Sequence, residues 1–175
     1  MLNRRELLGG GLAWLAAQAR PNILFVLADD LGWADLSCYG SALHETPNLD
    51  RLAKSSMKFT CAYTAGAVCS PTRASIMTGQ YPARVGITDY IPGLKVENRR
   101  LLAPEDLHEL PLNHVTLGEA LRSGGYQTFY SGKWHLGGAG FSPAEQGFEV
   151  HVEEGGGPRD GTTANRYTRG CLDFL

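Results

Sequence analysis

The sequence has no apolar run long enough to span a bilayer and no strong excess of charge of either sign. With 16 Lys and Arg against 18 Asp and Glu, the formal net charge is −2. Nothing therefore points to a nucleic-acid partner, to an anionic membrane surface or to an integral membrane protein. The 175 residues are enough for one globular domain with a hydrophobic core.

Cysteine is also scarce, and its spacing shows no dense disulfide framework. An exported protein could pair some of its cysteines, but no connectivity follows from the sequence. If Cys69 has a chemical role, at most one bridge can form among the others. These are Cys38, Cys61 and Cys171.

The first 19 residues differ in character from the rest of the chain. Arg4 and Arg5 precede an apolar stretch at residues 7–17, and residues 17–19 (AQA) fit a small-x-small cleavage site. We therefore predict an export signal at residues 1–19, of the twin-arginine type, and a mature portion at residues 20–175 in the periplasm or outside the cell. The alternative is an N-terminal helix of the mature fold, which the glycines at 9–11 would weaken.

Two segments have the character of buried strands. Residues 22–27 (NILFVL) form a continuous apolar run, and residues 126–131 (YQTFYS) predict a second strand. Residues 59–65 are expected to be extended, and residues 80–110 are expected to be surface loops because of their prolines and glycine.

Helices are predicted between these strands. Thr46 is a candidate N-cap before Pro47, and a short helix is expected after Pro71. Thr116 opens a Thr-x-x-Glu capping box, and residues 166–175 suggest an amphipathic helix. Alternating strands and helices predict an α/β fold with a mostly parallel sheet, in which ligands bind beyond the carboxyl ends of the strands.

Three polar clusters are expected at that edge of the sheet. The adjacent carboxylates of Asp29 and Asp30 would repel each other unless a cation lies between them, and hard divalent ions such as Ca²⁺ or Mg²⁺ prefer oxygen ligands. Alternatively, one of them caps the next turn and the other is solvated. Lys133 and His135 could bind an anion and move a proton, or could be a solvated lysine and a histidine satisfied by backbone.

The third cluster surrounds Cys69. A cysteine before a helix N-terminus, with Arg73 one turn later, lies where negative charge is favoured and could be a nucleophile with His135 as its base. It could equally be a buried cysteine at a helix start, with Pro71 as an ordinary first-turn proline. The residues alone do not separate these interpretations.

Four segments resemble the type I, formylglycine-dependent sulfatases, in the order found in that family. Residues 69–73 (CSPTR) match the Cys-x-Pro-x-Arg signature, and residues 125–135 (GYQTFYSGKWH) match a second signature. Residues 20–40 resemble the opening strand with its metal-binding Asp-Asp pair, and residues 46–53 resemble the first helix. The likeness is greatest to arylsulfatases and N-acetylgalactosamine-6-sulfatases, and it implies an alkaline-phosphatase-like α/β sandwich.

The resemblance implies that a formylglycine-generating enzyme oxidises Cys69 to Cα-formylglycine before the chain folds. The hydrated aldehyde would attack the sulfur of a sulfate ester and later expel the sulfate. Asp29, Asp30 and the modified residue 69 would hold Ca²⁺ or Mg²⁺. Arg73 would hydrogen-bond the formylglycine, Lys133 would steady the negative charge, and His135 would accept a proton. Trp134 is expected to pack rather than react.

Members of this family are much longer than 175 residues. The further metal-binding pair, the second histidine and the second lysine that the family supplies find no match after His135, because Asp160, Asp173 and His151 do not fall in the expected patterns. We therefore expect the N-terminal part of a sulfatase catalytic domain, specific for aryl or carbohydrate sulfate esters. Two alternatives remain, a phosphonate monoester or phosphodiester hydrolase of the same superfamily and a catalytically inactive fragment.

Overall fold

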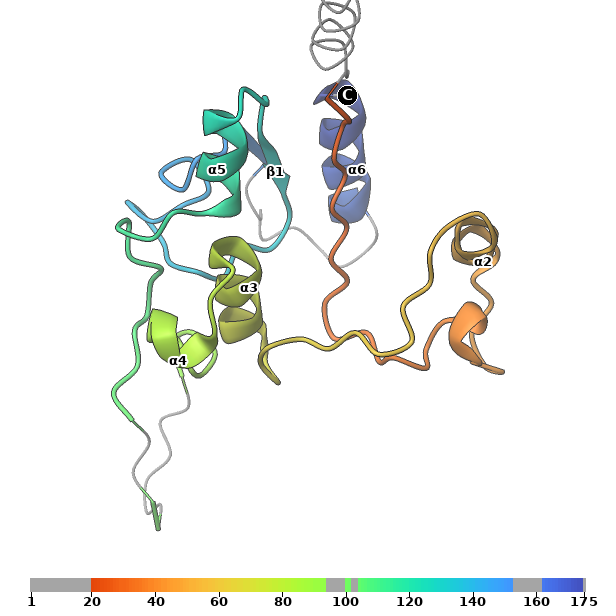
Figure 1. Cartoon of the computed structure of the whole chain (residues 1–175), viewed down its shortest axis with the longest axis horizontal. Helices are drawn as coiled ribbons and strands as arrows, with labels where there is room; N and C mark the ends of the chain where they lie inside the picture. The colour runs from red at the N-terminus through yellow and green to blue at the C-terminus, as the bar shows by residue number, and fades with distance from the viewer. Residues whose placement is uncertain (1–19, 94–99, 102–103, 153–161, 175) are drawn as a thin grey trace, which may run out of the picture. The chain divides into compact units, whose positions relative to one another are not determined.

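The computed structural model describes residues 20–93, 100–101, 104–152 and 162–174 (Figure 1). The chain divides into two compact units, Met1–Met57 and Lys58–Leu175, and each is described by itself. The predicted export signal at residues 1–19 lies outside the described residues. Over the described ranges, no helix has the length and apolar character needed to cross a membrane.

The first unit contains the short 3₁₀ helix η1 (Ser37–Tyr39) and helix α2 (Pro47–Lys54). Helix α2 begins with Pro47 after Thr46, as predicted. The hydroxyl of Thr46 does not cap a helical N–H group. It accepts a hydrogen bond from the Ser37 backbone N–H at 3.0 Å and lies 3.0 Å from the Asp50 carboxylate, to which it donates. Thr46 therefore joins η1 to α2.

Residues 22–27 do not form the predicted strand. The segment has no regular secondary structure, and its apolar side chains are exposed, with Val26 at 81%. A strand is stable only when a neighbouring strand pairs with its backbone N–H and C=O groups. The described part of Met1–Met57 holds no such neighbour, so the apolar run alone does not produce a strand here. Residues 59–65 likewise follow an irregular path without a strand.

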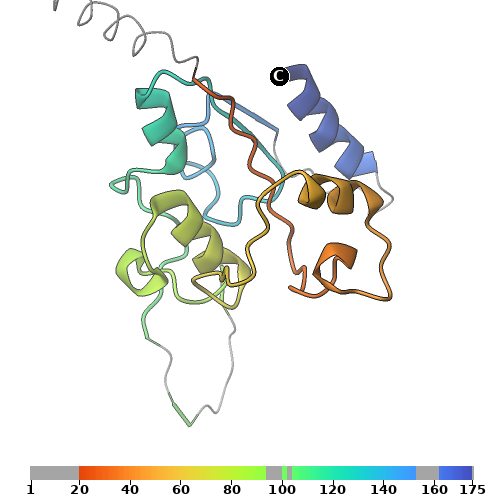
Figure 2. The same cartoon turned by 45° about the vertical axis from the view of Figure 1, so that its right-hand side comes forward.

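The second unit contains most of the regular structure. Helices α3 (Cys69–Thr78), α4 (Pro82–Val85) and α5 (Leu117–Ser123) precede strands β1 (Phe129–Ser131) and β2 (Val150–Val152), and helix α6 (Thr162–Phe174) follows them. Helix α3 contacts both α4 and α5, as Figure 1 and Figure 2 show. The strands pair in parallel, with Phe129 opposite Val150. An α/β arrangement is therefore present, and its sheet has two strands within the described residues.

Local signals decide where the helices start and stop. Helix α3 begins at Cys69, three residues earlier than predicted, so Pro71 lies inside the first turn, where its missing N–H group is not needed. Gly79 ends the helix at a φ of 67°, a left-handed conformation that suits glycine. The capping box of α5 is confirmed. Thr116 Oγ1 accepts from the Glu119 N–H at 3.2 Å, and Glu119 accepts from the Thr116 N–H at 2.8 Å.

The core of the second unit lies around three aromatic rings. Tyr130 meets both Trp134 and Phe148 edge-on, with ring centroids 5.1 Å apart in each pair. Trp134 is buried and donates from Nε1 to the Phe141 carbonyl at 2.7 Å, so the prediction that it packs is confirmed. The buried apolar residues of this core are Ala74, Met77, Val85, Ile87, Leu110, Trp134, Leu136 and Phe148.

Helix α6 packs against the sheet, and it starts earlier than the predicted amphipathic segment. Phe174 stacks on Phe129 of β1, with ring centroids 5.1 Å apart. At Gly170, an added Cβ would lie 3.0 Å from the Val152 side chain. A glycine at this position therefore allows the helix to approach β2 closely.

Candidate active site

The CSPTR segment forms the first turns of α3. Cys69 is half-buried, and none of the four cysteines forms a disulfide. The next residue, Ser70, is fully buried, and Arg73 is 6% exposed. A free thiol that is not buried in the core, beside a buried serine and arginine, is unlike an inert core cysteine.

Arg73 reaches the turn that follows β1. Its Nη1 group donates a hydrogen bond to the backbone carbonyl oxygen of Lys133. The hydroxyl of Tyr130 donates to the same oxygen at 2.6 Å. Gly132, with φ at 105°, turns the chain between these residues. A buried guanidinium needs hydrogen-bond acceptors, and the Lys133 carbonyl supplies one. The structure thus brings two of the predicted site residues together, although through a backbone atom.

His135 is held in a defined orientation and tautomer. Its backbone has a φ of 57°, which is uncommon for a residue with a side chain, and its Nε2 lies 2.6 Å from the Ile91 carbonyl oxygen. Because a carbonyl oxygen can only accept, Nε2 must carry the proton, and the neutral ring has its lone pair on Nδ1. That nitrogen is buried, and within the described residues it has no hydrogen-bond partner. One ring nitrogen is therefore satisfied by backbone. The role of His135 in proton transfer stays a prediction.

Three further residues belong to this arrangement. Ser70 Oγ accepts a hydrogen bond from the Ile91 N–H at 3.0 Å, Ile91 binds His135, and Tyr130 fixes Lys133. Ser70 was visible as a position of the Cys-x-Pro-x-Arg motif. Nothing in the sequence pairs it with residue 91, and Tyr130 gives no signal beyond its place in a strand.

Asp29 and Asp30 belong to the first unit, so their predicted convergence with Cys69 stays a prediction. Both are exposed, and Asp30 has a φ of 57°. Their carboxylate oxygens are donors of the kind that Ca²⁺ and Mg²⁺ prefer. Over the described ranges no three His, Cys, Asp or Glu side chains are grouped to hold a metal ion. The pair therefore fits a hard cation chemically and can supply only part of its coordination sphere.

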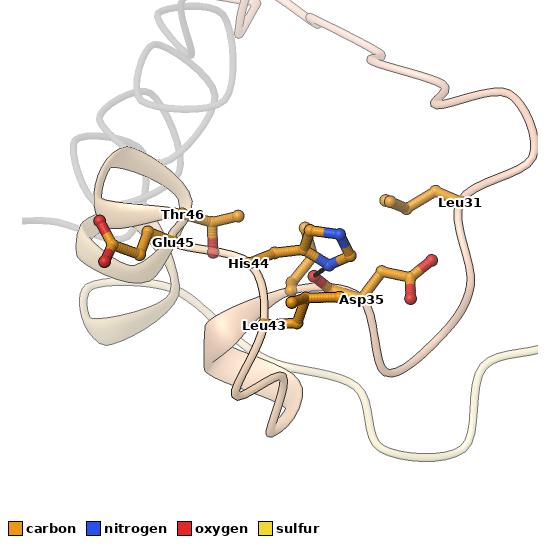
Figure 3. Close-up of a pocket in the computed structure, with 7 residues that line it drawn as sticks. Leu31, Asp35, Leu43, His44, Glu45 and Thr46 are labelled. Carbon is orange, nitrogen blue, oxygen red and sulfur yellow. Dashed lines mark hydrogen bonds between the residues drawn. The ribbon is translucent and has the colours of Figure 1, made fainter.

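The first unit also has an open hollow of about 540 Å³, drawn in Figure 3. His44 lies in it, with Nδ1 3.1 Å from the Asp35 carbonyl oxygen and 3.4 Å from Ser41 Oγ. The Asp35 carboxylate accepts from the Gly32 N–H at 2.7 Å. These polar groups form hydrogen bonds with nearby residues of the same segment and do not converge on a common point. The hollow therefore does not form a ligand-binding site. Its lining residues are Leu31, Asp35, Leu36, Leu43, His44, Glu45 and Thr46.

The parallel strand pair, the CSPTR helix and the Lys-Trp-His turn together indicate one class of protein, the sulfatases, which are hydrolases of sulfuric esters. The Sulfatase family model matches residues 21–171, and the chain belongs to this family.

Known relatives agree with this assignment. Human arylsulfatase A is 44% identical over 148 residues, which cover 82% of this chain and 27% of that protein. Canine N-acetylgalactosamine-6-sulfatase is 40% identical over 141 residues, covering 79% of this chain and 26% of the relative. The chain thus spans about a quarter of the length of the curated relatives it matches.

Solved structures share the fold over the same portion. The crystal structure of Ps i-CgsB superimposes with a TM-score of 0.66 at 32% identity, covering 90% of this chain and 34% of that one. A structure from a study of glycosaminoglycan metabolism by Bacteroides thetaiotaomicron gives a TM-score of 0.61 at 36% identity, covering 75% and 28% of the two chains.

Proposed function

We propose that the protein, in its natural full length, hydrolyses sulfate esters through a formylglycine derived from Cys69. The observation that carries this proposal is the bond between Arg73 and the Lys133 carbonyl. It joins the segment to be modified with the turn that carries Lys133 and His135, within one compact unit. Family membership supports the reaction class.

Each candidate site residue in the second unit has a defined role in this proposal. Formylglycine at position 69 would supply a hydrated aldehyde, whose hydroxyl is the nucleophile toward sulfur. Arg73 orients the start of α3 relative to the turn after β1. His135 accepts a proton on Nδ1, because Nε2 is already donating to Ile91. Lys133 carries a positive charge at the turn, which would stabilise negative charge on a sulfate oxygen.

Asp29 and Asp30, together with residue 69, would hold a divalent cation, and we favour Ca²⁺ or Mg²⁺ because all the side-chain donors are oxygens. Such an ion would neutralise charge on the sulfate. Ligands from elsewhere in the full-length protein would complete its coordination sphere.

We propose a sulfated carbohydrate as the substrate class, with aryl sulfates as the alternative. One similar structure, 31% identical with a TM-score of 0.60, is Ps i-CgsB in complex with k-i-k-neocarrahexaose. A second relative is named for the 6-sulfate of N-acetylgalactosamine. The first name describes an oligosaccharide and the second a sulfated sugar, and the arylsulfatases among the relatives support the alternative.

The experiment that tests this function combines mass spectrometry and sulfate release. The full-length protein is produced with a formylglycine-generating enzyme, and the peptide containing residue 69 is examined for the aldehyde. Sulfate release is then measured from sulfated oligosaccharides and from an aryl sulfate, for the parent protein and for Cys69→Ala. We expect release that requires both the aldehyde and added Ca²⁺ or Mg²⁺. Cleavage of phosphonate or phosphodiester substrates alone, or no turnover by fully modified protein, would contradict the proposal.

We also propose that the protein works in the periplasm or outside the cell, on the strength of the paired arginines and the apolar stretch at residues 7–17. Fractionation of the source cells tests this. Recovery only from the cytosol, with residues 1–19 still attached, would contradict it.

A further inference from the structure

We infer that Ser70 is a positioning residue that holds His135 in its reactive tautomer through the backbone of Ile91. The inference rests on the proposed function, in which His135 accepts a proton. Ser70 itself does not touch the reacting atoms in this view. It acts through two successive hydrogen bonds.

The first bond joins α3 to the segment between α4 and α5. Ser70 Oγ accepts from the Ile91 N–H at 3.0 Å, across 21 residues of chain. Ser70 is fully buried, so bulk solvent does not compete for this bond. Ile91 lies where the described residues form no helix or strand, and its backbone N–H group therefore depends on a side chain for a partner.

The second bond joins Ile91 to the histidine. The Ile91 carbonyl oxygen accepts from His135 Nε2 at 2.6 Å, across 44 residues. Both polar backbone groups of Ile91 are thus bound to side chains of the candidate site, the N–H group to Ser70 and the carbonyl oxygen to His135. The Ile91 side chain also packs against the hydrophobic core, which limits its movement.

The chemical consequence concerns the proton on the imidazole ring. The neutral ring can carry its proton on either nitrogen, and the Ile91 carbonyl selects Nε2. Nδ1, which is buried and has no partner among the described residues, is then the basic atom. If the Ser70 hydroxyl is removed, the Ile91 N–H loses its buried partner and the Ile91 backbone shifts. The carbonyl then holds the ring less firmly, and the second tautomer becomes populated.

This assignment gives Ser70, the residue after the cysteine, a structural role that is separate from recognition by the modifying enzyme. Thr72 provides the matched comparison, because it is the other variable position of the same Cys-x-Pro-x-Arg motif and also carries a hydroxyl. Its Oγ1 donates to the Gly66 carbonyl at 2.9 Å, away from Ile91. Removing either hydroxyl could change the yield of formylglycine, but only Ser70 is connected to His135.

The test uses the natural full-length protein with ¹⁵N-labelled histidine. Ring nitrogen shifts of His135, assigned by comparison with His135→Gln, report the tautomer at a pH where the ring is neutral. We expect the parent, Ser70→Thr and Thr72→Ala to show a protonated Nε2, and Ser70→Ala to show a mixture. Formylglycine content is measured for every variant, so that turnover is expressed per modified site.

In the same variants we expect kcat per formylglycine to fall about 10- to 100-fold in Ser70→Ala, the loss that misplacement of a catalytic group by about 1 Å produces. KM should change little, and Ser70→Thr should restore kcat. An unchanged tautomer in Ser70→Ala would overturn the inference. If the parent protein turns over no sulfate ester, the proposed function fails, and the nitrogen shifts still decide whether Ser70 positions His135.

Discussion

The guanidinium of Arg73 donates a hydrogen bond to the backbone carbonyl of Lys133, sixty residues further along the chain. This bond ties the helix of the CSPTR motif to the turn after β1, and Tyr130 reinforces the turn at the same oxygen. Arginine and lysine are not equivalent at such a position. The planar guanidinium presents five N–H donors in a rigid arrangement, whereas the lysine ammonium is a compact charge on a flexible stem.

Arg73→Lys should therefore weaken both stability and activity. We expect the free energy of unfolding to fall by about 1–3 kcal/mol, the value of a buried hydrogen bond made by a charged group. Urea denaturation measures this loss, with Arg122→Lys as the control, since Arg122 is exposed on α5. Equal stabilities of the two variants would show that the Arg73 bond contributes nothing to folding.

Thr116, the N-cap residue of helix α5, should be a sensitive position. Its hydroxyl accepts from the Glu119 N–H and also donates to the Gln146 carbonyl at 2.6 Å in a buried position. Thr116→Val keeps the shape and removes both bonds, so we expect a loss of about 1–3 kcal/mol. Thr116→Ser retains the hydroxyl and should be much closer to the parent in thermal unfolding. Identical melting of both variants would contradict this role.

Gly147→Ala should be strongly destabilising. Gly147 has a φ of 91°, and an added Cβ would clash with the Glu119 backbone nitrogen. Left-handed strain and overpacking together should cost about 2–5 kcal/mol. Gly138→Ala is the matched control, because nothing lies within 4 Å of its added Cβ. Chemical denaturation of the two variants measures the difference, and a stable Gly147→Ala protein would show that the turn can rearrange.

Glu145 should give the protein a small dependence of stability on acid pH. Hydrogen bonds from the Ser142 side chain and then from the Ser142 backbone N–H, at 2.7 Å to Oε2, hold the pKa of the Glu145 carboxyl below its usual value. A lowered folded-state pKa stabilises the protein above the unfolded pKa, and this stabilisation is lost as the pH falls through the folded pKa. NMR titration of Glu145 measures the pKa directly.

The variant Glu145→Gln should lose this acid dependence. Its stability relative to the parent should be lower near neutral pH and should converge on the parent as the carboxyl is protonated. Glu105→Gln, at another exposed glutamate, serves as the control. A Glu145 pKa at or above the usual value for glutamate would contradict the expectation.

Local chemistry made several elements predictable from the sequence. The capping box at Thr116, the proline at the start of α2 and the glycine after Thr78 each act within a few residues, so a local pattern was sufficient. The strand expected at residues 22–27 depends on a partner elsewhere in the chain, and the apolar run could not specify one.

The same distinction applies to the candidate site. The motif located Cys69 and Arg73, and a second motif located Lys133 and His135. The residues that connect them could not be predicted, because Ser70 meets Ile91 across 21 positions and Ile91 meets His135 across 44. Contacts over such separations depend on the folded arrangement and leave no periodic pattern in the sequence.

The long reach of the Arg73 bond has a consequence for the order of events during synthesis. The CSPTR segment is synthesised well before Lys133 and His135, so the bond between Arg73 and the Lys133 carbonyl cannot yet form. At ordinary elongation rates this interval lasts roughly 3–13 seconds. Under the proposed function, the modifying enzyme would act on the nascent segment during that time, before the Lys-Trp-His turn arrives.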